Sequence, residues 1–267
     1  MEKKRISRRL RPEKRRARFI STLVMVIASC VFLYAGFNLF LIFSEYNKSD
    51  SEYKSLEETV ISIQIPNAAD EEETIFKVDF DKLKEINSDV LAWIRFENPD
   101  KISYPVVAGI DNDVYLTRTF EGKYNASGTL FVDMNNHGDF KDHNTFIYGH
   151  NMKNGSMFGQ LRKYQEKKFC TENPYFYIYT PDGREIKYQV FAACIVKDTS
   201  DSFTKWYEND SEFMDYINYE KRMSLYSVDI EVESIETIVT LSTCTNVRDD
   251  ERLLVHGVKV NERIIED

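Results

Sequence analysis

The stretch TIVTLSTCTNVRDDERLLVHGVKV, residues 237–260, holds two β-prone runs on either side of a polar, charged gap. The first run ends at a cysteine, Cys244, and the second begins at Arg252. Aliphatic and β-branched runs bounded by polar residues are typical of strands. A thiol at a strand end is held rigidly at the rim of a sheet, which suits a reactive cysteine; the alternative is a buried structural cysteine.

Upstream of this stretch, short β-prone runs alternate with turn residues. Residues 176–197 indicate a hairpin with Pro181-Asp182-Gly183 at its turn, and residues 203–223 switch to helical spacing before the cysteine run. Many short strands with few helices predict a mainly β fold, a closed or nearly closed barrel with one helical insertion. Further β-prone runs cover residues 102–109, 127–133 and 144–150.

The segment DFDKLKEINSDVLAWIRF, residues 79–96, predicts one helix that leads into the barrel. Asp79 or Asp81 would cap its N-terminus, because a short acidic side chain there accepts a backbone N–H. Leu83, Ile86 and Val90 would lie on one face of this helix.

The N-terminal part of the chain has a different composition from the rest. Residues 1–18 contain ten Lys or Arg and two Glu, which leaves 25 basic and 42 acidic residues, a net charge of −17, in the remainder. Residues 19–43 follow as 25 residues without a charge. At about 1.5 Å rise per residue, a helix of this length crosses a hydrocarbon core of about 30 Å.

These features predict four parts: a basic cytoplasmic tail (1–18), a transmembrane anchor (19–43), a juxtamembrane linker and helix (44–78) and a folded domain (79–267). Basic residues before the span favour a cytoplasmic N-terminus, so the acidic domain would lie outside the cell. A cleaved secretory signal would have a shorter apolar run and a small-residue cleavage site. Ile27-Ala28-Ser29-Cys30 resembles a lipoprotein box, but apolar residues continue past Cys30.

Four cysteines are present, and one of them, Cys30, lies in the predicted span. The other three are Cys170, Cys194 and Cys244, an odd number that cannot pair completely within the chain. At least one external thiol should therefore be free, which again draws attention to Cys244. We interpret Cys170 and Cys194 as packing residues.

Histidine and arginine provide the candidate partners for the thiol. His150 ends a β-prone run and could act as acid or base, with His137, His143 and His256 as rivals. Arg252 could stabilise an oxyanion, whereas an ordinary surface ion pair with its acidic neighbours is the alternative; Arg248 is a second candidate. The sequence contains no C-x-x-C or H-E-x-x-H pattern and no Gly-rich phosphate loop, so we expect no metal and no cofactor.

Taken together, these segments resemble the sortases. TLSTC, residues 240–244, resembles the T-L-x-T-C nucleophile motif, and Arg252 is similar to the arginine that opens the next strand. YGHNMKNGSMF (148–158), YPVVAGIDNDVYL (104–116) and the helical insertion resemble class B members in particular. The resemblance covers roughly residues 80–262 and implies a sortase-like closed β-barrel of about eight strands, with helices at its N-terminus.

The resemblance also implies a function, a membrane-anchored cysteine transpeptidase at the surface of a Gram-positive bacterium. It would cleave a C-terminal sorting signal of the N-P-x-T-[NGS] type after Thr and transfer the secreted protein to an amine of the peptidoglycan. Cys244 would be the nucleophile, His150 the acid and base, and Arg252 the oxyanion ligand. Further residues expected to bind the substrate are Asn112, Leu116, Ser242 and Thr243.

Three alternatives remain open from the sequence. A pilus-polymerising sortase would use a pilin lysine as the attacking amine, and a surface cysteine protease would only hydrolyse. A catalytically silent binding module would lack the Cys, His or Arg, all of which are present. The acidic domain does not suggest nucleic-acid binding.

Overall fold

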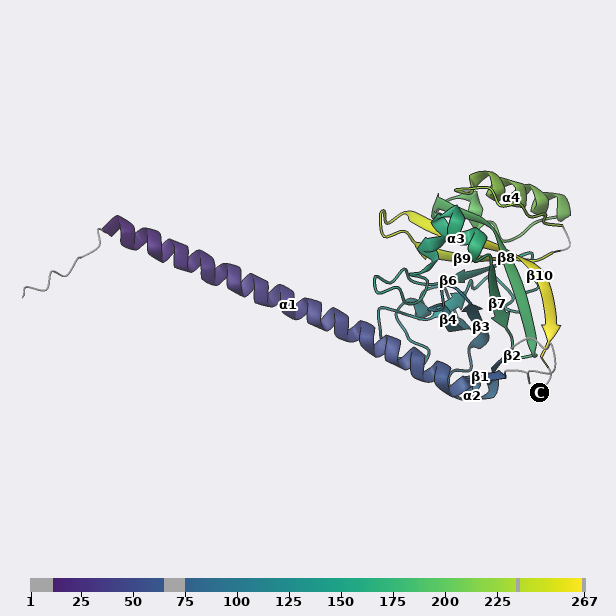
Figure 1. Cartoon of the computed structure of the whole chain (residues 1–267), viewed down its shortest axis with the longest axis horizontal. Coiled ribbons are helices and arrows are strands. Elements are labelled where there is room, and N and C mark those ends of the chain that lie inside the picture. Colours follow the sequence, from purple (N-terminus) through teal and green to yellow (C-terminus); the bar gives the residue numbers. More distant parts are fainter. Residues whose placement is uncertain (1–11, 65–74, 234–235, 266–267) are drawn as a thin grey trace, which may run out of the picture. The chain divides into compact units, whose positions relative to one another are not determined.

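The computed structural model describes residues 12–64, 75–233 and 236–265 (Figure 1). It divides into two compact units, with the boundary between Asn47 and Lys48. The first eleven residues of the predicted basic tail and the acidic run 70–74 of the predicted linker lie outside the described residues. Residues 48–60 belong to the second unit, where Tyr53, Leu56 and Val60 are buried.

The order of helices and strands follows the predicted change from helix to sheet. Most helices are short, and the strands of the second unit contain more of its residues than the helices do. The elements are α1 (Pro12–Val60), β1 (Ile61–Gln64), β2 (Ile75–Val78), α2 (Phe80–Ile86), β3 (Val90–Phe96), β4 (Ser103–Ala108), η1 (Val114–Leu116), β5 (Leu130–Val132), β6 (Asn144–Tyr148), η2 (Leu161–Gln165), α3 (Lys167–Glu172), β7 (Tyr175–Tyr179), β8 (Arg184–Lys197), η3 (Asp201–Phe203), α4 (Asp210–Met223), β9 (Ile238–Cys244) and β10 (Glu251–Ile264).

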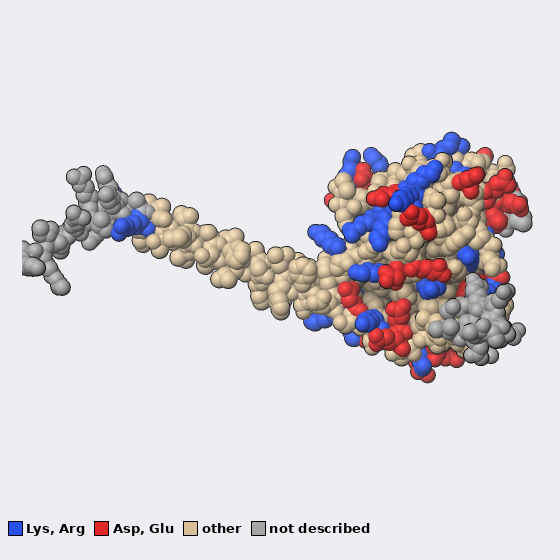
Figure 2. Space-filling model, in the orientation of Figure 1, with Lys and Arg blue, Asp and Glu red and all other residues tan. Residues whose placement is uncertain are grey.

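Helix α1 contains the uncharged run of the sequence. Its part from Arg18 to Val60 includes an 18-residue window of mean hydropathy 2.2, none of which is buried. By length and composition this helix could cross a membrane. Figure 2 shows its apolar stretch free of Lys, Arg, Asp and Glu, whereas both signs of charge are interspersed over the drawn face of the second unit.

The prediction of one helix over residues 79–96 is wrong in its second half. Helix α2 ends at Ile86, and Val90–Phe96 form strand β3. Asp79 does cap the helix, since its carboxylate accepts the backbone N–H of Lys82 at 3.1 Å. The helix stops because the side chain of Asn87 accepts the backbone N–H of Asp89 at 3.0 Å in a local turn. The strand is buried on both faces and therefore lacks the alternation that would have indicated it.

Eight strands form the predicted closed barrel, in the order β10-β8-β7-β3-β4-β5-β6-β9. Closure leaves no unpaired edge and holds every strand in a fixed register. The hairpin of β7 and β8 turns at Pro181-Asp182-Gly183 as predicted, with Gly183 at a φ of +81° that favours glycine. A separate two-stranded sheet pairs β1 with β2.

The helical insertion before β9 is also confirmed and consists of η3 and α4. Phe213, Tyr216 and Ile217 of α4 pack against apolar residues of β8, β9 and β10. Cys194 of β8 belongs to this cluster, and it is fully buried, as is Cys170 of α3. The interpretation of both cysteines as packing residues agrees with these positions.

Candidate functional site

Strand register brings the three predicted catalytic residues to one edge of the barrel. Strands β6 and β9 are parallel with Tyr148 opposite Ser242, so His150 and Cys244 both come two residues after a paired position. Strand β10 runs antiparallel to β9, and its register places Arg252 directly opposite Cys244. Parallel strands end at the same edge of a sheet, which is why residues 94 positions apart in sequence can meet.

A pocket of about 350 Å³ lies at this edge. All seven predicted site residues line it, and Cys244 itself is partly exposed. Three further lining residues were not predicted, although two of them lie in the YGHNMKNGSMF segment. The full lining is Asn112, Leu116, Phe131, Tyr148, Gly149, His150, Ser242, Thr243, Cys244 and Arg252.

Hydrogen bonds fasten the histidine segment to the cysteine segment. The hydroxyl of Thr243 donates to the carbonyl of Gly149 at 2.7 Å, and the side-chain amide of Asn151 donates to the carbonyl of Cys244 at 2.7 Å. Both side chains are therefore engaged in holding the backbone on which the thiol and the imidazole are mounted. Asn151 is not among the predicted site residues, and its amide gives it this supporting role.

Glycine is required at position 149 because of close packing. A Cβ atom there would lie 2.3 Å from a methyl of Leu130 and 2.7 Å from the ring of Phe158. Such distances are well inside van der Waals contact, so any side chain would force Leu130 and Phe158, or the backbone next to His150, to shift.

The tautomer of His150 follows from its hydrogen bond. Its Nε2 lies 2.7 Å from the carbonyl oxygen of Leu116, at the end of η1. A carbonyl only accepts, so Nε2 carries a proton and donates it to Leu116. Nδ1 is then the nitrogen whose lone pair can accept a proton.

The guanidinium of Arg252 is held by the turn before β10 and by the turn after β8. One terminal nitrogen donates to the carbonyls of Asp249 and Glu251, at 2.7 and 3.0 Å. The other lies 3.5 Å from the carboxylate of Asp198. Within the described residues this leaves the Nε–H and one terminal N–H, two donors with which the fork can bind an oxyanion.

The rival candidates lie elsewhere. His137 lies beside the carboxylate of Asp142, which raises the pKa of His137. The ring of His143 packs against the ring of Phe213, with 4.9 Å between the ring centres. Arg248 is 59% exposed and pairs with Asp250 and Glu251. Neither these residues nor those of the insertion are among the described residues that line the pocket.

Comparison with known proteins agrees with this arrangement. The family described as sortase domain matches residues 99–260. Sortase B of Listeria monocytogenes is 34% identical over 185 residues, which are 67% of this chain and 73% of that protein. This chain belongs to the class B sortases. It is therefore a cysteine transpeptidase, as the resemblance implied.

Solved structures support the same assignment for the fold. Sortase B from B. anthracis, in complex with AAEK1, has a TM-score of 0.70 and 28% identity, covering 82% of this sortase and all of that chain. The Staphylococcus aureus sortase B–substrate complex has a TM-score of 0.64 and 28% identity, covering 68% of this sortase and 85% of that chain.

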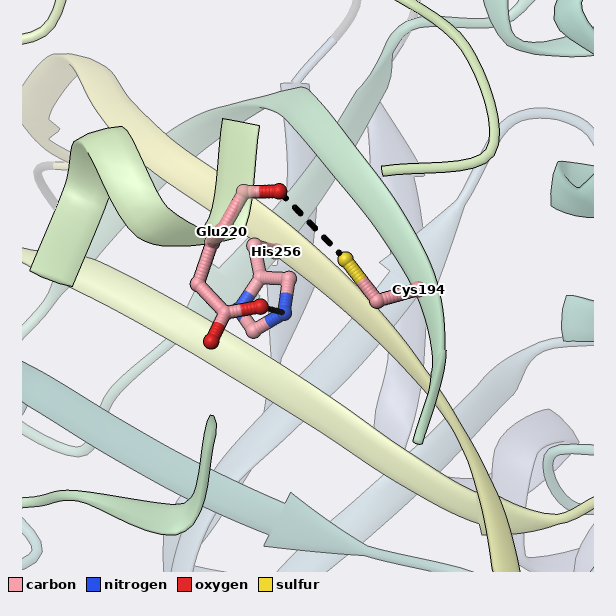
Figure 3. A group of neighbouring side chains, drawn as sticks. All are labelled: Cys194, Glu220 and His256. Atoms are coloured by element: carbon pink, nitrogen blue, oxygen red, sulfur yellow. Dashed lines mark hydrogen bonds and ion pairs between the residues drawn. The ribbon is translucent and has the colours of Figure 1, made fainter. Parts of the chain in front are cut away.

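A second group of reactive side chains lies in the core of this sortase, under the insertion. Cys194 of β8, Glu220 of α4 and His256 of β10 are all fully buried (Figure 3). Their ligand atoms lie within 4.8 Å of one another, close enough that these residues could hold a metal ion.

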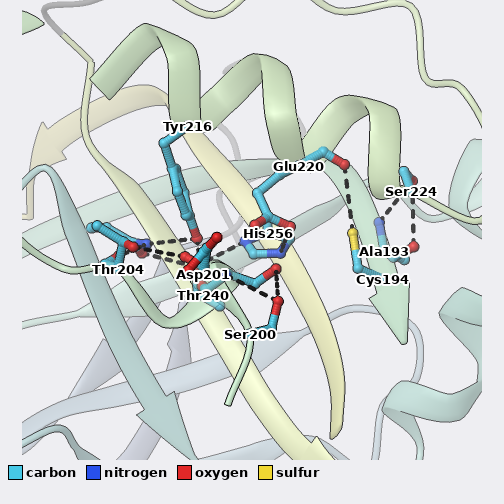
Figure 4. Close-up of polar contacts among 12 residues, drawn as sticks. Ala193, Cys194, Ser200, Asp201, Thr204, Tyr216, Glu220, Ser224, Thr240 and His256 are labelled. Atoms are coloured by element: carbon cyan, nitrogen blue, oxygen red, sulfur yellow. Dashed lines mark hydrogen bonds and ion pairs between the residues drawn. The ribbon is translucent and has the colours of Figure 1, made fainter. Parts of the chain in front are cut away.

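The hydrogen-bond directions around His256 can be assigned one by one. Asn144 donates its amide to Tyr216 at 3.1 Å, and its carbonyl oxygen accepts the hydroxyl proton of Thr240 at 2.8 Å (Figure 4). The oxygen of Thr240 then accepts the Nδ1–H of His256 at 2.9 Å. Nε2 lies 3.3 Å from the carboxylate of Glu220, and the imidazole holds the pKa of that carboxyl below its usual value against the effect of burial. Glu220 and His256 thus form a buried pair.

The thiol of Cys194 keeps its proton. Burial, together with the nearby charge of Glu220, raises the pKa of Cys194. Its sulfur lies 3.5 Å from the backbone carbonyl of Glu220, to which the thiol donates. The contacts among these residues attach α4 to strands β8 and β10 of the barrel.

Proposed function

We propose that this sortase cleaves a C-terminal sorting signal of the N-P-x-T-[NGS] type after Thr and joins the released protein to an amine of the peptidoglycan. The observation that carries the proposal is the pocket in which Cys244, His150 and Arg252 lie together in a class B sortase chain. The S. aureus sortase B described above has a similar fold and was solved in complex with a substrate. This supports peptide binding at the edge of the barrel that contains Cys244.

The first half of the reaction forms an acyl-enzyme. The thiolate of Cys244 attacks the carbonyl carbon of the signal's threonine, and the resulting oxyanion accepts hydrogen bonds from the free N–H groups of Arg252. The C–N bond then breaks, and Nδ1 of the His150 imidazolium donates its proton to the departing amine. The product is a thioester on Cys244.

The second half joins the acyl group to a new amine. The incoming amine attacks the thioester carbonyl, and neutral Nδ1 of His150 accepts its proton. Thiolate leaves, which restores Cys244 and completes the exchange of one amide for another. The residues of the pocket supply every group this scheme requires, and it uses no metal or cofactor.

The location of the enzyme forms part of the same proposal. Helix α1 would span the membrane with its basic N-terminal end in the cytoplasm, and the barrel would lie outside. Secreted proteins emerge on that side, and cell-wall precursors are joined there. The uncharged run 19–43 and the ten basic residues that precede this run support this orientation.

The test combines a peptide library with a panel of variants. Full-length enzyme in detergent would be incubated with quenched peptides of the N-P-x-T-x and L-P-x-T-G types, with and without short amines, and analysed by mass spectrometry. We expect a thioester on Cys244 and amine-dependent ligated product. Cys244→Ala should abolish both, whereas Cys170→Ala, which removes a buried thiol, serves as the matched control.

Three other outcomes would contradict the proposal. Hydrolysed product without ligation, even at high amine concentration, would identify a protease. No cleavage of any peptide, together with a Cys244 thiol that resists alkylation, would identify a silent binding module. Cleavage of N-P-x-T-x peptides with ligation only to a lysine-bearing pilin peptide would identify the pilus-polymerising alternative.

A further inference from the structure

Asp133 directly follows β5 and carries the most heavily hydrogen-bonded carboxylate near the pocket. It is only 2% exposed. One oxygen accepts the amide of Asn112 at 3.2 Å, the hydroxyl of Tyr148 at 2.8 Å and the ammonium of Lys205 at 3.1 Å. The other oxygen accepts the backbone and side-chain N–H groups of Asn135, both at 2.9 Å.

Two of these partners, Asn112 and Tyr148, line the pocket that contains Cys244. The amide of Asn112 is held at both ends, because its oxygen also accepts the backbone N–H of Met134 at 2.8 Å. Asp133 itself is not among the lining residues. Its carboxylate therefore fixes two walls of the pocket from behind, without contact to the thiol.

The third partner, Lys205, belongs to the helical insertion. Its side chain is 17% exposed, and its ammonium lies 5.4 Å from the ring centre of Phe146. Burial by itself would raise the pKa of Asp133, but hydrogen bonds from Asn135, Tyr148 and Lys205 hold it below its usual value. The insertion thus supplies the counter-charge for a buried carboxylate that organises the pocket.

We propose that Asp133 is a positioning residue for peptide binding, and that Lys205 keeps its carboxylate charged and in place. The proposal rests on the proposed function and extends it, since it assigns a role in the active site to the insertion. An uncharged residue at position 133 would lose the ion pair and at least one acceptor for Asn112 or Tyr148. Binding of the peptide should then weaken, while the reactivity of Cys244 stays intact.

The experiment compares variants of the full-length enzyme in detergent. Asp133→Asn and Lys205→Met test the two halves of the pair, and Lys168→Met is the matched control, because its ion pair with Glu172 is a surface pair, 83% and 59% exposed. The readouts are KM and kcat on the best peptide of the library above, and the rate of Cys244 alkylation by iodoacetamide. We expect Asp133→Asn to raise KM about tenfold and Lys205→Met about threefold, with alkylation within about twofold of wild type.

Several results would overturn the proposal. A KM for Asp133→Asn within about twofold of wild type would show that the carboxylate does not position the peptide. A parallel fall in kcat and in the alkylation rate would show that Asp133 supports the fold or the chemistry instead. Should Asp133→Asn fail to fold, Lys205→Met and Tyr148→Phe decide, and an unchanged KM in both rejects the proposal. If the wild-type enzyme turns over no peptide, the proposed function itself is wrong, which is a distinct result.

Discussion

The buried pair of Glu220 and His256 allows a quantitative prediction about stability. Both side chains are fully buried, and His256 lowers the pKa of Glu220 against the opposing effect of burial. His256→Met removes the imidazole that lowers the pKa of Glu220, so at pH 7 the buried carboxyl must take up a proton. For a group with an ordinary pKa of 4.5, this costs about 3.4 kcal/mol at pH 7 and about 1.4 kcal/mol at pH 5.5.

Thermal unfolding of the full-length enzyme, followed by tryptophan fluorescence, measures this cost. For a unit of about 220 residues, His256→Met should lower Tm by about 7–14 °C at pH 7 and by about 3–5 °C at pH 5.5. The double variant Glu220→Gln/His256→Met should recover most of the loss, because an amide needs no counter-charge. An equal loss at both pH values, or a double variant no more stable than the single, would refute the ion pair.

Three further predictions concern the residues that support the site. Gly149→Ala should lower the free energy of unfolding by about 1–3 kcal/mol and slow acylation, because the new Cβ would lie 2.3 Å from Leu130. Tm measures the first effect, and the rate of thioester formation measures the second. Asn151→Ala should lower kcat about tenfold with a loss of stability near 1 kcal/mol, because it frees the carbonyl of Cys244. A fall in kcat no larger than the loss of folded enzyme would contradict this. The lowered pKa of Asp133 means that its stabilising contribution is present above about pH 4 and lost as pH falls through the lowered value. Asp133→Asn should therefore show a smaller drop in Tm between pH 4 and pH 2 than wild type.

Strand ends were the most predictable feature of this chain. The run that stops at Cys244 and the run that starts at Arg252 fix an antiparallel pair, and closure of the barrel then sets their register. The position of His150 needed the family resemblance, because only tertiary structure makes β6 and β9 parallel neighbours. Local sequence carries no signal for the pairing of strands so far apart along the chain.

The residues that sequence reasoning missed have ordinary local contexts. Glu220 lies in an acidic helix and resembles a surface residue, yet α4 presents it to the core, where His256 balances its charge. Asp133 precedes two asparagines and reads as a turn, which it also forms through Asn135. In each case the function depends on a partner from a distant segment, which the chain does not encode locally.

The reactive thiol and the buried pair share one face of the same two strands. Side chains alternate along a strand, so Thr240 and Cys244 of β9 lie on the same side, as do Arg252 and His256 of β10. At about 3.3 Å per residue, the Thr240–His256 pair lies about 13 Å along the strands from the Cys244–Arg252 pair. The insertion covers one end of this face, and the pocket opens at the other. The closed barrel fixes the spacing of thiol and guanidinium, and Lys205 is one contact through which the insertion reaches the carboxylate behind the pocket.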